Sequence, residues 1–162
     1  NTDPLTRLLN RDGFYEKVSD AMREHPGQGL LLICDLDNFK RINDQYGHPR
    51  GDLVLQTFAD LLTEFFNRQG DVVSRMGGDE FAVFVGRELS RQDAEVMLGH
   101  LIAQTCKTFA EYESQALCVS AGAAFTSGDG GYDALYAVAD QALYEAKRGG
   151  KSGFRVAAET WE

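Results

Sequence analysis

The chain predicts a mixed α/β or α+β fold, and three observations support this prediction. Residues 30–34 form an uninterrupted apolar run after a glycine, which is typical of a fully buried central strand. Two further strand-like runs, 71–76 and 81–86, flank a short glycine-containing turn, which indicates a tight β-hairpin. Segments with apolar residues at helical spacing separate these strands. A sheet with several antiparallel pairs and helices packed on it is the economical architecture.

The remaining elements follow in order along the chain. We expect helices over residues 14–24, 39–43, 52–66, 90–109 and 132–148, and strands over 116–125 and 154–156. Ser90 is expected to cap the fourth helix, with Asp93 three residues on. Gly122 within a strand indicates a bulge or a close backbone approach. The predicted order of elements is αβααββαβαβ.

Length and composition indicate one ordinary globular domain. The chain has 162 residues, of which 43% are hydrophobic and 25% charged. The net charge of −9 disfavours a nucleic-acid partner, which needs a basic face, and suggests that a phosphate ligand would arrive with a divalent cation. No apolar run reaches membrane-spanning length and no signal peptide is evident. We expect a cytoplasmic domain that makes no membrane contact itself, whether it stands alone or is the cytoplasmic part of a larger, membrane-anchored protein.

The three cysteines and the chain ends lead to further expectations. Cys34, Cys106 and Cys118 lie in apolar segments without CxxC spacing, which predicts buried, reduced thiols and neither a disulfide nor a zinc site. The chain begins at Asn1 without a methionine, so we expect residues 1–162 to be one domain of a longer protein. Residues 157–162 are expected to form a loose tail.

The predicted hairpin carries two adjacent carboxylates, Asp79 and Glu80, beside the glycine pair 77–78. A solvated turn would account for this composition when it is taken alone. Asp35 and Asp37, however, end the buried central strand, where packing alone does not favour acids. If the hairpin neighbours that strand, Asp35 and Asp79 lie side by side, and such oxygen ligands suit Mg²⁺ together with substrate phosphates.

Three lysines complete a candidate phosphate site. Lys147 and Lys151 are four residues apart at the end of the last long helix, and would face one phosphate if the helix persists that far. Lys40 follows the acidic strand end. Carboxylate-held metal beside lysines is the arrangement that phosphoryl and nucleotidyl transfer needs. The alternative, in which the acids cap a helix and the lysines are solvated, explains single residues better than the whole set.

Residues 75–81, with the sequence Arg-Met-Gly-Gly-Asp-Glu-Phe, resemble the signature of the GGDEF family, the diguanylate cyclases. The match extends to four further segments. Residues 3–11 are similar to the family's DxLTGLxNR opening, 35–44 to DxDxFKxxND, 46–52 to its continuation, and 139–147 to ADxALYxAK. These co-linear motifs make the resemblance specific over residues 3 to about 154.

The resemblance implies a palm-like, largely antiparallel sheet surrounded by helices, as in nucleotidyl cyclases. It implies that two GTP molecules are joined into cyclic di-GMP with release of two pyrophosphates. Each subunit of an antiparallel homodimer would present one GTP, and the 3′-hydroxyl of each would attack the α-phosphate of the other. No Ser-His or Cys-His nucleophile pair is needed, because the nucleophile belongs to the substrate.

By position, the resemblance assigns the metal ligands and the catalytic residues. Asp35, Asp79 and the backbone carbonyl of Leu36 would hold Mg²⁺ or Mn²⁺, two ions per half-site. Glu80 would either complete the second metal site or help to remove the 3′-proton. Lys40 is assigned with Asp79 and Glu80 to the catalytic set.

The resemblance also assigns the nucleotide contacts. Asn43 and Asp52 would read guanine, because an aspartate can accept from the guanine N–H groups that adenine lacks. The remaining assigned residues contact the nucleotide backbone or its phosphates: Phe39, Lys40, Gly77, Gly78, Lys147 and Lys151. Lys151 stands where an arginine is usual, so it keeps the charge but loses the bidentate fork.

Arg68 and Asp71 match the family's RxxD element, the site of inhibition by cyclic di-GMP. A turn closed by a simple ion pair is the competing interpretation of that element. For the domain as a whole, the competing hypothesis is a non-catalytic regulatory module that binds GTP or cyclic di-GMP without turnover. The intact acids, with Asn43 and Lys40, favour the enzyme.

Overall fold

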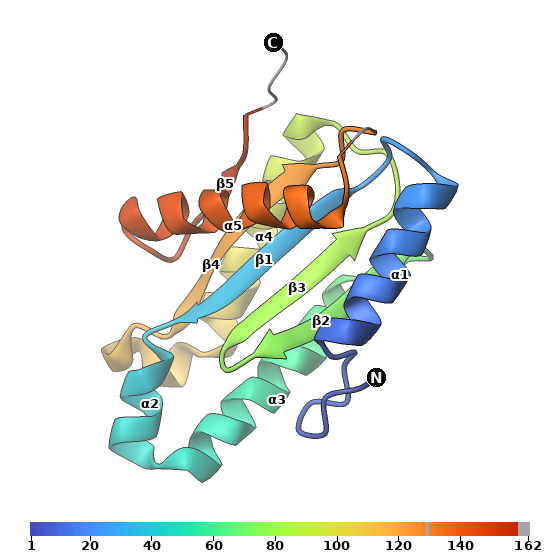
Figure 1. The fold of residues 1–162 in the computed structure, drawn as a ribbon. Helices are drawn as coiled ribbons and strands as arrows, with labels where there is room; N and C mark the ends of the chain where they lie inside the picture. The colour runs from blue at the N-terminus through green and yellow to red at the C-terminus, as the bar shows by residue number, and fades with distance from the viewer. Residues whose placement is uncertain (129, 159–162) are drawn as a thin grey trace.

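The computed structural model describes residues 1–128 and 130–158, and its elements follow the predicted order (Figure 1). The helices are α1 (Arg11–Glu24), α2 (Phe39–Tyr46), α3 (His48–Phe65), α4 (Arg91–Thr108), the 3-10 segment η1 (Ala110–Gln115) and α5 (Tyr132–Arg148). The strands are β1 (Leu30–Asp37), β2 (Asp71–Gly77), β3 (Glu80–Val85), β4 (Cys118–Phe125) and β5 (Phe154–Val156).

The five strands form one mixed sheet in the order β2-β3-β1-β4-β5. All neighbouring pairs are antiparallel except β4 and β5, which confirms the predicted largely antiparallel sheet. The central strand β1 has the hairpin strand β3 on one side and β4 on the other. Its register places Asp35 directly opposite Glu80.

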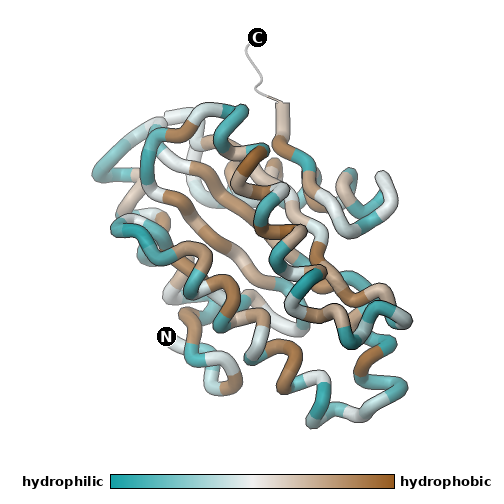
Figure 2. The backbone as a smooth tube through the Cα atoms, turned by 180° about the vertical axis from the view of Figure 1, so that it is seen from behind, coloured by the Kyte–Doolittle hydropathy of each residue, from teal (hydrophilic) through white to brown (hydrophobic). Residues whose placement is uncertain are grey.

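Helices cover both faces of the sheet, and alternation along the strands creates two cores. Leu30, Leu32 and Cys34 of β1 pack with α3 and α4, whereas Leu31 and Ile33 pack with α1 and α5. Figure 2 shows the strands as the continuous hydrophobic stretches of the chain, flanked by helices of alternating character. Because side chains alternate, the acids at positions 35 and 37 fall on the α1 and α5 face.

Several element boundaries differ from the prediction. The first helix begins at Arg11 because Asn10 caps it, its side chain accepting from Gly13 N. The third helix begins at His48 rather than at Asp52, since Pro49 fits the first turn of a helix. Ser90 caps α4 as predicted. At Gly122, a Cβ would lie 2.1 Å from Leu143 N, which confirms a close approach between β4 and α5.

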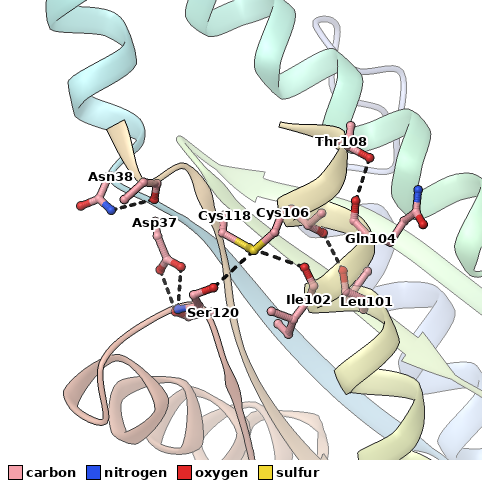
Figure 3. Close-up of a disulfide and its surroundings, with 12 residues drawn as sticks. Asp37, Asn38, Leu101, Ile102, Gln104, Cys106, Thr108, Cys118 and Ser120 are labelled. Carbon is pink, nitrogen blue, oxygen red and sulfur yellow. Dashed lines mark hydrogen bonds between the residues drawn. A yellow bond between two sulfur atoms is a disulfide. The ribbon is translucent and has the colours of Figure 1, made fainter. Parts of the chain in front are cut away.

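The prediction of three reduced cysteines is wrong. Cys106, near the end of α4, and Cys118, at the start of β4, form a disulfide (Figure 3). The chain reverses through η1 between them and brings their Cα atoms to 4.9 Å, a juxtaposition that spacing along the sequence does not reveal. Cys34 is the buried free cysteine, and burial, followed by the charges of Asp35 and Glu80, raises its pKa to about 12.

None of the helices in residues 1–128 and 130–158 is both long enough and apolar enough to cross a membrane.

Of the predicted loose tail, residues 159–162 lie outside the described residues. Ala157 does not belong to a loose segment, because its N–H donates to Ala123 O over 2.8 Å and continues the pairing of β5 with β4.

Candidate functional site

Two carboxyl groups meet where β1 passes the tip of the hairpin. Asp35 lies late in β1, and Asp79 lies in the turn between β2 and β3. Leu36 N donates to Asp79 O over 3.2 Å, which ties the tip to the central strand. Burial, the charge of Asp35 and a hydrogen bond to Asp35 together raise the pKa of Asp79 to about 6. A raised carboxyl pKa in such a pair indicates negative charge that is not fully compensated.

Lys147, in the last turn of α5, provides the positive charge nearest to this pair. Its Nζ lies 2.5 Å from Asp35 Oδ2, and the two side chains are 33% and 20% exposed. Because one ammonium faces two carboxyl groups, Asp79 keeps its raised pKa despite Lys147. The pair can therefore accept a further cation.

Glu80 is the first residue of β3 and the direct partner of Asp35 across the sheet. Its carboxylate turns toward α5, where Oε2 accepts from Tyr136 Oη over 2.8 Å. Burial, the hydrogen bond to Glu80 and the charge of Glu80 raise the pKa of Tyr136, so the phenol stays neutral and donates. The Tyr136 hydroxyl is therefore the contact that directs the Glu80 carboxylate toward α5.

The donor set at the tip fits a divalent cation in part. Within the described ranges, no three Asp, Glu, His or Cys side chains converge closely enough to hold a metal ion. Asp35 and Asp79 alone match the one or two carboxylates that Mg²⁺ usually takes together with phosphate oxygens. Two carboxylates leave the other ligand positions of such an ion for backbone, water or phosphate oxygens.

The glycines of the tip leave space for a ligand. Gly77 and Gly78 have φ of +147° and +52°, and a Cβ at either position would meet no heavy atom within 4 Å. Arg75 fixes this turn by donating from Nε and Nη2 to Gly78 O over 3.0 and 2.8 Å. The tip is both open and rigidly shaped.

The predicted guanine-reading residues lie at the α2–α3 corner. Asn43 Oδ1 is buried without a hydrogen-bond partner in the described structure. It lies directly against Gly51, where a Cβ would come within 1.9 Å of it. Asp52 follows at an exposed position of α3. Gly51 therefore makes the room that keeps Asn43 beside Asp52, and the unsatisfied amide oxygen is a group that a ligand can use.

Lys40 and Lys151 are not assembled with the acids. Lys40 Nζ pairs with Asp44 over 2.9 Å and its side chain is 85% exposed. Helix α5 ends at Arg148, so Lys151 does not share a helix face with Lys147, and its Nζ donates to Asn38 Oδ1 over 3.3 Å. Phe39, the last predicted nucleotide contact, is partly buried against the core.

Asp37 fastens the Lys151 loop to the sheet. This buried carboxylate accepts from Ser120 Oγ over 2.6 Å and from Ser152 N over 2.9 Å (Figure 3). The loop is thereby anchored to the same strand end that carries Asp35.

The predicted inhibitory pair lies apart from the acids, beside a pocket of about 570 Å³. Asp71 is turned inward: its side chain is 2% exposed, Oδ2 accepts from Arg68 N over 3.1 Å, and Oδ1 pairs with Arg87 Nη1 over 3.3 Å. Burial raises the pKa of Asp71, while the Arg68 N–H and the charge of Arg87 oppose that rise. Arg68 itself is exposed at the pocket, with Phe65 and His100 among the other lining residues.

Tyr136 and Arg87 have clear positions at these sites but were not singled out from sequence. Asp37 was grouped with Asp35 as a strand-end acid, but its role in anchoring the Lys151 loop was not predicted. Tyr136 could have been found from sequence, since it lies about three helical turns before Lys147 and hence on the same face of α5. Arg87 could not, because its pairing with Asp71 depends on how β2 lies against β3.

Comparisons with known proteins agree with this geometry. The family model described as "Diguanylate cyclase, GGDEF domain" matches residues 1–153. Diguanylate cyclase DgcP of Pseudomonas aeruginosa is 40% identical over 162 residues, covering 96% of this chain and 24% of that protein. Diguanylate cyclase DgcS of Shewanella oneidensis is 34% identical, covering 95% of this chain and 52% of that protein. The chain thus spans between a quarter and about half of these relatives.

Solved structures show the same likeness. The GGDEF domain of DgcB from Caulobacter crescentus, in complex with cyclic di-GMP, superposes with a TM-score of 0.85 at 28% identity, covering 96% of this chain and 94% of that one. The active GGEEF domain of a diguanylate cyclase from Vibrio cholerae gives 0.78 at 27% identity, covering 93% and 98%. With the family model matched over nearly the whole length, the chain belongs to the GGDEF domain family.

Proposed function

We propose that this domain is a diguanylate cyclase that condenses two GTP into cyclic di-GMP and two pyrophosphates. The observation that carries the proposal is the Asp35–Asp79 carboxyl pair, with its raised Asp79 pKa, beside the open Gly77–Gly78 turn. A carboxyl pair that lacks full compensation, next to a backbone that a ligand can approach, suits a metal-bound triphosphate. The names of the relatives support the same activity.

Each side chain would have a distinct part in binding. Asp35 and Asp79, with the Leu36 carbonyl, would hold Mg²⁺ or Mn²⁺, two ions per half-site when Glu80 takes part. When bound, these ions supply charge neutralisation on the phosphates and orientation of the attacking hydroxyl. Asn43 and Asp52 would select guanine, and the Gly77–Gly78 backbone, with Phe39, would lie along the nucleotide.

Lys147 would change partners when the nucleotide binds. Its Nζ is held at Asp35, where a divalent cation would take over the neutralisation of that carboxylate. The ammonium would then be free to contact a phosphate oxygen. Lys40 and Lys151, which now pair with Asp44 and Asn38, would make similar exchanges.

The reaction requires two copies of the domain, because each 3′-hydroxyl attacks the α-phosphate of the other GTP. Glu80 would act near that hydroxyl, either as a metal ligand or as the group that accepts its proton. Arg68, at the separate pocket, would bind cyclic di-GMP and slow further synthesis. Because GTP is its proposed substrate, we expect the domain to act in the cytoplasm.

The direct test is incubation of the purified protein with GTP or ATP and Mg²⁺, with products identified by mass spectrometry. We expect cyclic di-GMP from GTP, no cyclic product from ATP, and a rate per subunit that rises with protein concentration. Bound GTP without any product at high protein concentration would instead support the non-catalytic regulatory module.

A further inference from the structure

Helix α5 contacts two acidic side chains, Glu80 and Asp35, from one of its faces. Tyr136 and Lys147 lie about three helical turns apart, so both side chains project from the same side of the helix. Tyr136 Oη donates to Glu80 Oε2 over 2.8 Å, and Lys147 Nζ contacts Asp35 Oδ2 over 2.5 Å. The helix that crosses the sheet in Figure 1 therefore supplies a separate donor to each acid.

The two acids need separate donors because of their register. Asp35 and Glu80 are direct cross-strand partners on one face of the sheet, and like charges in that position repel each other. Lys147 compensates the charge of Asp35. Tyr136 carries no charge, so its effect on Glu80 is one of direction: the hydrogen bond determines where the carboxylate points.

A cluster of aromatic rings holds the Tyr136 ring in place. Its ring lies 5.8 Å from that of Tyr132, which in turn meets Tyr15 and Phe14 of α1 edge-on at 5.0 and 6.2 Å. The cluster joins α5 to α1 and restricts the position of the Tyr136 hydroxyl. In residues 1–128 and 130–158, that hydroxyl is the one hydrogen-bond donor to the Glu80 carboxylate, and it engages Oε2 alone.

We infer that Tyr136 is a positioning residue for Glu80, holding Oε2 so that Oε1 is the oxygen offered to a metal ion or to the 3′-hydroxyl. This inference rests on the proposed function and deepens it. Tyr136 would orient Glu80, while Lys147 of the same helix compensates the charge of Asp35.

The test uses Tyr136→Phe, which removes one oxygen and keeps the ring in the cluster. Tyr132→Phe is the matched control, since it removes a hydroxyl from the same cluster that does not contact Glu80. Two readouts are needed: steady-state cyclase kinetics, and Mn²⁺ affinity measured by electron paramagnetic resonance with 3′-deoxy-GTP, which lacks the nucleophile and cannot turn over.

For Tyr136→Phe we expect kcat to fall about tenfold, as for loss of one positioned hydrogen bond. The KM for GTP should change less than about twofold, because Tyr136 is far from the guanine-reading corner, and Mn²⁺ affinity should weaken about threefold to tenfold. Tyr132→Phe should leave all three quantities within about twofold of the unmodified protein.

A double-mutant cycle on Mn²⁺ affinity separates positioning from mere packing. In a Glu80→Gln background, Tyr136→Phe should have no further effect, because its influence passes through Glu80. Additive losses, or a Tyr136→Phe variant that keeps both kcat and Mn²⁺ affinity within about twofold of the unmodified protein, would overturn the inference. If the unmodified protein makes no cyclic di-GMP, the proposed function fails, and the Mn²⁺ measurements still decide the role of Tyr136.

Discussion

Two aspartates of the same hairpin differ in how far the surrounding protein compensates their negative charge. Asp79, at the tip, lies against a second carboxyl group and has its pKa raised to about 6. Asp71, at the start of β2, is almost fully buried, but both of its oxygens accept from the protein, one from Arg68 N and one from Arg87. Burial raises the pKa of both carboxyl groups, but only at Asp79 does a neighbouring carboxylate add to the rise, whereas the groups around Asp71 oppose it.

This difference separates a binding group from a structural one. A satisfied buried carboxylate stabilises the fold and gains little from a ligand, whereas an uncompensated one gains a great deal from a cation. At the RxxD element, the exposed Arg68 is therefore the better candidate for ligand contact, and Asp71 the better candidate for shaping the turn. Four predictions test that contrast, beginning with the largest expected effect.

Asp79→Asn should lower the rate of cyclic di-GMP formation by about 10³-fold, because it removes half of the carboxyl pair proposed to hold the metal ion. Its melting temperature should stay equal or rise, since one of two adjacent negative charges disappears. The exposed Asp20 provides a control: Asp20→Asn should affect neither quantity. Activity of Asp79→Asn within tenfold of the unmodified protein would contradict the assignment.

Asp71→Ala should lower the free energy of unfolding by about 2 kcal/mol, because it leaves the Arg68 N–H and Arg87 without their acceptor. Urea unfolding followed by circular dichroism measures this loss. Asp60→Ala, at an exposed position of α3, should cost less than about 0.5 kcal/mol. If both variants are equally stable, Asp71 has no structural role.

Arg68→Ala should weaken inhibition by cyclic di-GMP about tenfold, the loss expected for a charge-assisted hydrogen bond. The initial rate and the unfolding free energy should remain nearly unchanged, since this exposed side chain lies apart from the acidic pair. Arg23→Ala removes an equal charge from an exposed ion pair on α1 and should leave inhibition intact. Unaltered inhibition in Arg68→Ala would exclude a role for the RxxD element.

The smallest expected effect is a dependence of stability on pH in the absence of divalent cations. The pKa of Asp79 is about 6 in the folded protein against an ordinary 3.8, so the folded state binds this proton more tightly than the unfolded chain does. The resulting stabilisation is complete below pH 3.8 and is lost as the pH rises through 6.

Because Asp79 is only half-buried, solvent reduces this contribution to about 1 kcal/mol. The measurement is the difference in unfolding free energy between the unmodified protein and Asp79→Asn at several pH values across that range. A difference that does not vary with pH would show that Asp79 and Asp35 do not share a perturbed site.

Much of the architecture was predictable from local patterns. The order of elements, the hairpin and the buried central strand follow from periodicity and turn chemistry, which act over a few neighbouring residues. The same patterns put Asp35 near the end of the buried strand and Asp79 at the hairpin turn, and the five co-linear motifs indicated the family. That these two residues are neighbours follows from the pairing of β1 with β3.

Only the tertiary structure determined which partner each polar side chain takes. Lys147 engages Asp35, Glu80 turns to Tyr136, Asp71 is satisfied by Arg87, and Cys106 joins Cys118. Each of these contacts depends on how two elements lie against each other, and a one-dimensional pattern contains no such distances. The sequence by itself therefore determined where the charged groups lie along the fold, and packing decided which of them are satisfied within the protein and which remain for a ligand.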